Sequence, residues 1–291
     1  MDKVILQKWL KSGYLEKTIF YDTETGTPQG GIISPVLANM TLDGLEAKIC
    51  RVYPRRSKKQ YSTKVHVVRY ADDFVITGSS KELLENEVRP LVESFLHERG
   101  LELSPEKTRI TTVEEGFDFL GQTVRKFNGK TIIKPSKNNV SAFLTKIRET
   151  LRKGRAWRTA EVIETLNPKI MGWANYHRHA SSKKTFSKVD NAIYEMLWPW
   201  AVRRHRKDDK GNRWIAKRYF GSKGGRNWTF YGTKKGKDGI PETVWLKFAA
   251  HTTIRRHPKI KGAANPYDPQ WNSYFEDRKA TASPAKRRSP G

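Results

Sequence analysis

The sequence predicts an α+β fold, in which an antiparallel sheet with packed helices is followed by a helical module and a short mixed region. In the first 135 residues, short apolar runs such as VVRYADDFVITG, residues 67–78, alternate with stretches of helical periodicity. After Pro135 the apolar residues recur with the period of an α-helix. The 291 residues suffice for one large domain or two to three small ones, each with its own core.

The N-terminal region is expected to begin with a short helix and a strand over residues 2–20. A glycine-rich turn is predicted in TGTPQGGIISP, residues 25–35. Ser34 is expected to cap the next helix, and Pro35 suits the first turn of that helix because a backbone N–H has no helical partner there. The basic stretch RVYPRRSKKQ, residues 51–60, is predicted to be a loop.

The run at 67–78 is predicted to be a buried β-hairpin, because apolar residues lie on both sides of its centre. A helix is expected over residues 80–98, bent at Pro90, which has no backbone N–H, and ended by Gly100. The elements predicted after it are strands at 109–113 and 117–125 and a hairpin turn at Asn128–Gly129.

Beyond Pro135 the sequence predicts three helices. The first carries an apolar stripe that consists of Val140, Phe143, Leu144, Ile147 and Leu151. The other two are expected at about 159–178 and 187–204. Residues 205–260 are rich in Gly, Lys and Trp and are predicted to contain short strands, whereas ATASPAKRRSPG, residues 280–291, is predicted to be disordered.

Composition excludes several classes of protein. No run of eighteen apolar residues is present, so no membrane span is expected. The apolar run near the N-terminus has only three residues, which does not suit a signal peptide. Cys50 is the only cysteine, which excludes an internal disulfide framework and a cysteine-based zinc cluster and indicates a reducing compartment.

The positive charge is concentrated in the second part of the chain. Residues 1–122 carry 17 Lys and Arg against 18 Asp and Glu, whereas residues 123–291 carry 39 against 12. Eight of the nine tryptophans also lie in residues 123–291. A basic surface with interleaved aromatic residues suits nucleic acid, which has phosphates to neutralise and bases to stack on. An anionic membrane is the weaker alternative, because no long amphipathic helix with a clean apolar face supports it.

Asp72 and Asp73 stand side by side in the predicted hairpin. Buried carboxylates are costly unless they are paired, hydrogen-bonded or bound to a metal. Hard oxygen ligands suit Mg²⁺, and two such ions form the clamp that polymerases and nucleases use for in-line phosphoryl transfer. That clamp needs a further carboxylate from another strand. The alternative is an ordinary exposed Asp-Asp turn, and the hairpin alone leaves both interpretations open.

Several motifs in a fixed order resemble those of one protein family. TPQGGIISPVLAN, RYADDFVI, GLELSPEKT and FDFLG resemble the palm motifs of group II intron reverse transcriptases. LNPKIMGWANYHRH, continuing to LWPW and RWIAKRYF, resembles the maturase region that follows the polymerase in that family. The resemblance covers residues 3–278 and implies a partial right-hand polymerase palm followed by a helical thumb. The implied domains are a partial palm at 1–135, a thumb/maturase domain at 136–210, a basic nucleic-acid-binding module at 211–260, and an endonuclease-approach segment with a disordered tail at 261–291.

The resemblance also implies roles for individual residues. Asp72 and Asp73 would hold Mg²⁺, with Asp72 as the principal ligand, and Lys107 would lie near the triphosphate. The nucleotide and template pocket would consist of Pro28, Gln29, Gly30, Gly31, Tyr70 and Ala71. The primer grip would consist of Phe119, Leu120 and Gly121. The RNA-binding residues would be Trp173, Tyr176, Arg178, Arg203, Arg204 and Arg206.

Each of these roles has a plainer alternative. The TPQGG glycines allow close approach of a ligand to the backbone, but they also suit a simple strand-to-helix turn. Lys107 could be an ordinary surface lysine, and Phe119 to Gly121 a core strand. Core packing is the plainer interpretation of Trp173, whereas the arginines are expected to meet phosphate. His177 and His179 are two residues apart, which does not place them on one helical face for a metal.

The implied function is that of an RNA-directed DNA polymerase and maturase, which binds group II intron RNA and a DNA target or primer and assists splicing. Members of the family carry fingers and a first palm strand with another catalytic aspartate before TPQG, whereas only 26 residues precede Thr27 here. The sequence therefore predicts that a separate polypeptide supplies those parts. The alternative is a non-catalytic RNA-binding maturase fragment or an inactive remnant. The family's endonuclease body does not follow residue 278, so no DNA cleavage is expected, and the expected location is the bacterial cytoplasm, with an organelle as the alternative.

Overall fold

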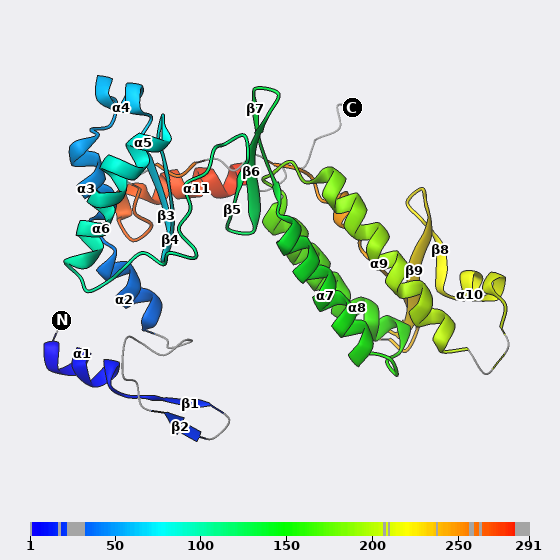
Figure 1. Cartoon of the computed structure of the whole chain (residues 1–291). Coiled ribbons are helices and arrows are strands. Elements are labelled where there is room, and N and C mark those ends of the chain that lie inside the picture. The colour runs from blue at the N-terminus through cyan, green and yellow to red at the C-terminus, as the bar shows by residue number, and fades with distance from the viewer. Residues whose placement is uncertain are drawn as a thin grey trace. The chain divides into compact units, whose positions relative to one another are not determined.

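The computed structural model describes residues 2–16, 19–21, 33–205, 208, 210–236, 238–255, 259–261 and 264–282 (Figure 1). The chain mixes α-helices with antiparallel sheets, in agreement with the predicted α+β class. It divides into two compact units. Unit 1 comprises residues 1–120 and 124–131, and unit 2 comprises residues 121–123 and 132–291.

The N-terminal elements of unit 1 are α1 (Lys3–Leu10), β1 (Tyr14–Glu16), β2 (Ile19–Tyr21), α2 (Ser34–Thr41), α3 (Leu45–Val52) and α4 (Lys58–Thr63). Pro35 lies in the first turn of α2 as predicted, but Ile33 is the N-cap residue, so the prediction that Ser34 caps the helix is wrong. The reason is that Ile33 is already in helical conformation, with φ −84° and ψ −19°. The predicted loop at 51–60 is also partly helical, because Ser57 accepts the N–H of Gln60 and caps α4.

The predicted hairpin is confirmed as β3 (His66–Tyr70) and β4 (Asp73–Thr77), which pair antiparallel. The helix predicted over 80–98 is interrupted: α5 (Lys81–Leu83) leads into a π-helical turn (Leu84–Val88) and then α6 (Arg89–His97). Pro90 explains the interruption, because its ring would clash with the carbonyl of Asn86 in a regular α-helix, and the wider π turn relieves that contact. Gly100 ends the helix with φ +66°, and Leu101 N–H donates to the Leu96 carbonyl across it.

The prediction of a strand at 109–113 is wrong. Thr111 donates its hydroxyl hydrogen to Glu115, and Glu115 N–H donates to the Thr112 hydroxyl. These local bonds favour a turn, because they satisfy polar groups that a strand would leave to a neighbouring strand. The predicted strand at 117–125 is split into β5 (Phe117–Phe119) and β6 (Gln122–Phe127) by a turn at Leu120–Gly121.

The predicted turn at Asn128–Gly129 is confirmed. Both residues have positive φ, 46° and 74°, as a type I′ hairpin turn requires. The turn leads into β7 (Lys130–Pro135), and the three strands form a sheet in the order β5-β6-β7.

The core of unit 1 lies between its helices and one face of the β3–β4 hairpin. Its fully buried apolar residues are Leu42, Leu45, Ile49, Tyr53, Val65, Val88, Val92, Phe95 and Leu96. Val67, Phe74 and Ile76 of the hairpin pack against this core. Val68 and Tyr70, on the opposite face, are 57% and 65% exposed. The prediction of a buried hairpin is therefore wrong, because in the described part of the chain this sheet has two strands and only one covered face.

Unit 2 contains the three long helices that the sequence predicts, α7 (Lys137–Lys153), α8 (Thr159–His177) and α9 (Lys183–Arg203). They are followed by α10 (Asn212–Tyr219) and by a sheet of β8 (Phe220–Lys223), β9 (Arg226–Lys235) and β10 (Pro241–Trp245) in the order β10-β9-β8. Figure 1 shows this sheet close to α8 and α9. The last helix, α11 (Asn272–Ala282), includes the first three residues of the segment predicted to be disordered, and the rest of that segment lies outside the described residues.

The core of unit 2 joins all of these helices except α11 to the sheet. Apolar residues of α7, α8 and α9, such as Ile147, Ile170 and Leu197, are fully buried together. Phe220 and Phe230 of the sheet belong to the same cluster. Among the described residues, no helix has both the length and the apolar character that crossing a bilayer requires.

Candidate active-site turn and nucleic-acid interface

The β3–β4 turn places the predicted catalytic carboxylates at the end of a hairpin. Ala71 and Asp72 form the turn, and Tyr70 pairs with Asp73 across it. Ala71 has φ +52°, in the left-handed region that costs a residue with a side chain about 1–2 kcal/mol. Such strained residues cluster at functional sites, where the surrounding structure holds them in place.

The carboxylates of Asp72 and Asp73 are exposed. The argument that burial requires a metal to compensate them is therefore wrong for this conformation. In the described part of the chain, neither carboxylate has an ion pair with a Lys or Arg side chain. Two unpaired carboxylates next to each other in sequence remain available to a cation.

Arg69 braces this turn. Its guanidinium Nη1 donates to the Ala71 carbonyl and to Asn39 Oδ1, at 2.9 Å in each case. Asn39 in turn donates its side-chain N–H to the Pro35 carbonyl, which links the turn to α2. Arg69 lies opposite Phe74 in the register, and both are half-buried, on the face that packs on the core. Arg69 was not among the residues predicted to be functional, although a charged residue on an apolar strand face needs a partner and can be recognised in the sequence for that reason.

The donor set at the turn fits Mg²⁺ in part. Carboxylate oxygens are the ligands that Mg²⁺ prefers, and the ion normally completes its shell with water and substrate phosphates. However, no group of three or more Asp, Glu, His or Cys side chains converges on one point within the described residues. Asp72 and Asp73 would therefore supply part of a metal site.

The other predicted palm residues are described only in part. Lys107 is exposed in a short turn after Ser104, whose carbonyl accepts the Lys107 N–H at 3.2 Å. The pocket residues Pro28, Gln29, Gly30 and Gly31 lie outside the described residues. Tyr70 and Ala71 adjoin the carboxylates, as their sequence positions require.

Gly121 of the predicted primer grip has a defined steric reason to be glycine. Its φ is +70°, and a Cβ built on it would lie 2.6 Å from the side-chain nitrogen of Asn139. The adjoining Phe119 and Leu120 are half-buried. A larger residue at position 121 would therefore displace Asn139.

Asn139 is the centre of a partly buried polar network in unit 2. Its Oδ1 accepts the indole N–H of Trp173 at 2.8 Å and lies 2.9 Å from His177 Nε2. His177 is fully buried, and this burial lowers its pKa to about 4. The neutral imidazole then donates from Nε2, while its Nδ1 has no partner in the described part of the chain.

The predicted RNA-binding aromatics lie at different depths. Trp173 is half-buried and stacks on Phe143 with ring centroids 4.8 Å apart, so it contributes to packing. Tyr176 is 53% exposed and meets His177 edge-on. Only the tyrosine of this pair presents a largely open ring.

The predicted RNA-binding arginines also differ. Arg178 is half-buried and donates to Asn175 at 3.3 Å. Arg204 donates to the carbonyls of Arg155 and Trp157, at 2.9 Å each. Arg203 is exposed, and Arg206 lies outside the described residues.

Arg203 and Arg204 belong to a groove between α7 and α9 that the sequence analysis missed. The groove has a volume of about 580 Å³, and its charged lining consists of Arg148, Arg152, Arg155, Arg203, Arg204 and Glu195. In the described structure none of these arginines forms an ion pair with a carboxylate. Arg148 and Arg152 are four residues apart, the spacing of neighbours on one helix face, which could have been read from the sequence, whereas Arg155 follows the end of α7.

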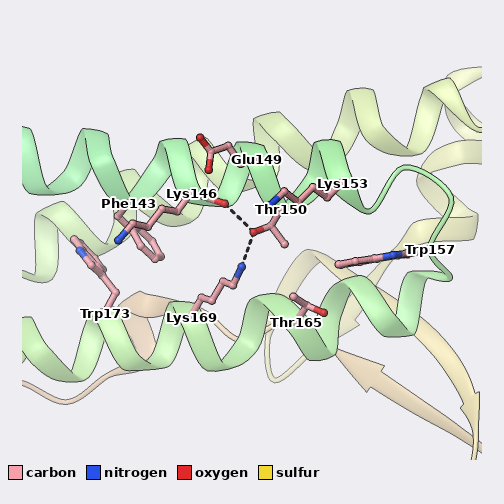
Figure 2. A pocket seen from close by; sticks show the side chains of 9 residues that line it. All are labelled: Phe143, Lys146, Glu149, Thr150, Lys153, Trp157, Thr165, Lys169 and Trp173. Atoms are coloured by element: carbon pink, nitrogen blue, oxygen red, sulfur yellow. Dashed lines mark hydrogen bonds between the residues drawn. The ribbon is translucent and has the colours of Figure 1, made fainter. Parts of the chain in front are cut away.

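A second cleft lies between α7 and α8 (Figure 2). It has a volume of about 450 Å³ and is lined by Phe143, Lys146, Glu149, Thr150, Lys153, Trp157, Thr165, Lys169 and Trp173. Lys169 reaches across it from α8 and donates to the Thr150 hydroxyl at 2.6 Å. Both hollows of the helical bundle are thus lined mainly by cations and aromatic rings.

Two family models match separate parts of the chain. The model described as "Reverse transcriptase (RNA-dependent DNA polymerase)" matches residues 1–124. The model described as "Group II intron, maturase-specific domain" matches residues 140–220. The first match contains the Asp72–Asp73 turn, and the second contains α8, α9 and most of α7.

Similar proteins come from bacteria and from a fission yeast. "Group II intron-encoded protein LtrA" of Lactococcus lactis subsp. cremoris is 25% identical over 274 residues, which cover 66% of this chain and 45% of the relative. "Protein YkfC" of Escherichia coli (strain K12) is 31% identical over 149 residues, which cover 42% of this chain and 38% of that protein. The "Uncharacterized 91 kDa protein in cob intron" of Schizosaccharomyces pombe is 24% identical over 253 residues, which cover 63% of this chain and 31% of that protein.

The chain spans slightly less than half the length of the Lactococcus relative. The two family matches follow each other in the order polymerase and then maturase, and the similarity to the intron-encoded protein extends across both. The chain is thus similar to group II intron-encoded reverse transcriptases and maturases in both of its matched parts.

Proposed function

We propose that this chain takes part in RNA-directed DNA synthesis and in the splicing of a group II intron. In this proposal residues 1–135 act as the palm, residues 136–210 as the thumb and maturase domain, and residues 211–260 as a further basic nucleic-acid-binding module. The observation that carries the polymerase role is the exposed Asp72–Asp73 pair, which lies on a strained turn bound by Arg69 and has no ion-pair partner in the part of the chain that the structure describes. The bound molecules would be intron RNA and a DNA target or primer.

Asp72 and Asp73 would hold Mg²⁺, with Asp72 as the principal ligand. The ion would stabilise charge on the reacting phosphate oxygens when it is bound. Lys107 would stabilise the negative charge that develops on the leaving pyrophosphate. The residues from Pro28 to Gly31 would line the nucleotide pocket. Gly121 and its neighbours would support the primer end.

In this proposal the site requires a further carboxylate, and the β3–β4 sheet, as far as the structure describes the chain, offers unpaired edges to a strand that carries one. Each strand of the two-stranded β3–β4 sheet has a free edge in the described part of the chain. We therefore propose that a segment with fingers and the remaining aspartate pairs at one of these edges. The proposal applies equally to a segment in the same natural protein and to a separate polypeptide.

Primer extension tests this function. The purified chain is incubated with an RNA template, a DNA primer, deoxynucleotides and Mg²⁺, with and without a polypeptide that supplies fingers and the first aspartate strand. We expect Mg²⁺-dependent extension only in the complemented mixture. Asp72→Asn should reduce it at least about 10³-fold, because the principal ligand is lost, whereas Asp73→Asn should reduce it less. Equal losses for both variants would contradict the assignment of Asp72, and robust extension without complementation would contradict the missing-carboxylate argument.

A second candidate function is a non-catalytic maturase that binds intron RNA and assists its folding. The observation in its favour is that no third metal-binding side chain joins the two aspartates within the described residues. In that case Asp72→Asn would leave RNA binding and splicing assistance unchanged, and complementation by a well-folded, associating polypeptide would produce no DNA.

A further inference from the structure

The cleft between α7 and α8 combines a flat ring with uncompensated positive charge. Figure 2 shows Trp157 at one end of the cleft and Trp173 beside Phe143 at the other. Lys146 and Lys153 come from α7, and Lys169 comes from α8. The volume of about 450 Å³ lies within the range of small-molecule sites, about 300–1,000 Å³.

Trp157 is the side chain in this cleft that is suited to stack on a ligand. A Cβ built on Gly154 would lie 2.5 Å from the Trp157 ring, so the ring lies directly against the Gly154 backbone. Since one part of the indole is seated in this way and the residue also lines the cleft, the ring is a fixed platform. Trp173 is different, because its ring stacks on Phe143 and its N–H is used by Asn139.

The three lysines have no carboxylate partner in the described part of the chain. Lys169 donates to the neutral hydroxyl of Thr150, which itself donates to the Lys146 carbonyl at 2.8 Å. Glu149 is the only acidic residue of the lining. The cleft therefore has an excess of positive charge that one phosphodiester group, or two, would offset.

We propose that this cleft binds one unpaired nucleotide of the RNA, with its base stacked on Trp157 and its phosphate near Lys153 and Lys169. The proposal rests on the RNA binding proposed above and gives it a local specificity. A base within a duplex has neighbours on both of its faces and cannot stack on the ring at the end of this cleft, whereas a bulged or looped base can. Aromatic stacking with cationic side chains beside it is the usual arrangement for unpaired nucleotides.

Two matched RNA hairpins test the proposal with the full chain. They have the same stem, closed by the same non-nucleotide linker so that no looped base is present, and one carries a single bulged nucleotide in the stem. The probe is fluorescently labelled, and affinity is measured by anisotropy at fixed salt. We expect wild-type protein to bind the bulged hairpin about 5- to 150-fold more tightly, which corresponds to about 1–3 kcal/mol for one stacked base.

Trp157→Leu should abolish this preference while leaving affinity for the unbulged hairpin unchanged, because leucine keeps apolar volume but has no flat face. Lys153→Gln, at an exposed position that tolerates substitution, should reduce the preference severalfold. Trp228→Leu is the matched control, since Trp228 is 53% exposed and lies outside the cleft, and it should keep the full preference.

The outcomes separate this proposal from the proposed function. Equal affinity of the wild-type protein for the two hairpins would overturn the nucleotide site and leave RNA binding intact. Absence of binding to either hairpin at low salt would contradict the proposed RNA-binding function itself. If both Trp157→Leu and Lys153→Gln keep the tighter binding of the bulged hairpin, the bulged nucleotide binds at another site, and the assignment to this cleft is overturned.

Discussion

The two units hold their functional side chains by different means. In unit 1 the carboxylates lie on a single strained turn at the end of a two-stranded sheet, and Arg69 is the side chain that ties this turn to a helix. In unit 2 most of the cationic side chains that line the two hollows lie on helices of 17 to 21 residues. Of the described residues, 20 form the buried core of unit 2 and nine form that of unit 1.

This difference has a consequence for function. Side chains on long packed helices keep their spacing without a ligand, so the basic surface of unit 2 is already formed in the isolated chain. The turn in unit 1 is held by one guanidinium and has an open sheet edge on either side, so its final geometry depends on what pairs there. Variants that weaken one unit should therefore leave the activity of the other intact.

The largest effect is expected in unit 2 at acid pH. His177 has a pKa of about 4 in the folded chain, against 6.5 when exposed. As the pH falls from 6.5 to 4, the unfolded chain binds the proton and the folded chain does not, so the free energy of unfolding decreases by up to about 3 kcal/mol. Above pH 7 both states are neutral at this residue and the effect vanishes.

Urea unfolding followed by tryptophan fluorescence measures this effect, because eight of the nine tryptophans lie in residues 123–291. His177→Gln is the control, since its amide can still donate to Asn139 but does not titrate. The comparison with this variant also removes the contribution of Asp190, whose pKa is raised by burial. An equal loss of stability in both proteins at pH 4.5 would show that His177 is not responsible.

The second effect concerns the arginine groove. Changing Arg148, Arg152 and Arg155 together to Gln should lower RNA affinity about 100-fold near physiological salt. The dependence of log affinity on log salt should become shallower by about 2–3, because each lost phosphate contact contributes about 0.7–0.9 to the slope.

The matched control replaces three lysines on another surface of unit 2, Lys217, Lys235 and Lys247, which are exposed. Both triple variants remove the same charge, so an equal loss of affinity would show that overall charge matters and the groove does not. Binding curves at four salt concentrations give both quantities.

Long helices with one apolar face could be predicted from the sequence. Local hydrogen bonds from side chains that replace a strand could not. The three helices of unit 2 were predictable because each runs for several turns with one apolar face. The Asn128–Gly129 turn was predictable because those two residues suit positive φ. The absence of a strand at 109–113 was not, because it depends on bonds between Thr111, Thr112 and Glu115 that satisfy polar groups locally.

At the candidate sites, composition and motifs predicted charged residues but not how the fold arranges them. The exposure of Asp72 and Asp73 depends on which faces of β3–β4 are covered, and this is a property of the neighbouring elements. Asn139 binds Trp173 and His177, which lie 34 and 38 positions further along the chain, so no local sequence pattern predicts this network. The arginine groove could be predicted only in part. The spacing of Arg148 and Arg152 on α7 is visible in the sequence, whereas the position of Arg203 and Arg204 beside them follows from helix packing.

The third effect concerns unit 1 at alkaline pH. Tyr53 is almost fully buried and donates its hydroxyl hydrogen to Glu87, and burial followed by this partner raises its pKa to about 12. The folded chain keeps the proton between pH 10 and 12 while the unfolded chain loses it, so the contribution of Tyr53 to stability is lost as the pH rises through 12. The free energy of unfolding decreases by up to about 2.7 kcal/mol across that window. Unit 1 is therefore expected to lose stability in a pH range where the titration of His177 does not affect unit 2.

Hydrogen–deuterium exchange of peptides from α3 and α6 measures this locally. Tyr53→Phe removes the titrating group and leaves Glu87 in solvent. At pH 8 the wild-type protein should be the better protected of the two, and the difference should shrink as the pH rises from 10 and disappear by about pH 12. A constant difference across this range would show that the Tyr53 hydroxyl does not titrate with folding.

The smallest effect tests the brace that distinguishes unit 1. Arg69→Lys keeps the charge but cannot reproduce the two bonds from one guanidinium nitrogen, and Asn39→Ala removes one of the acceptors. Each variant should lower the rate of primer extension in the complemented mixture about 10-fold, the loss expected for about 1.4 kcal/mol, while the Kd for RNA stays unchanged. Arg89→Lys, which affects an exposed ion pair with Glu93 on α6, should keep the wild-type rate.

If Arg69 acts through Asn39, the double variant Arg69→Lys with Asn39→Ala should be little slower than either single variant, because both changes remove the same interaction. Losses that multiply to about 100-fold would instead mean that Arg69 and Asn39 act independently, and the turn would then be positioned by other contacts.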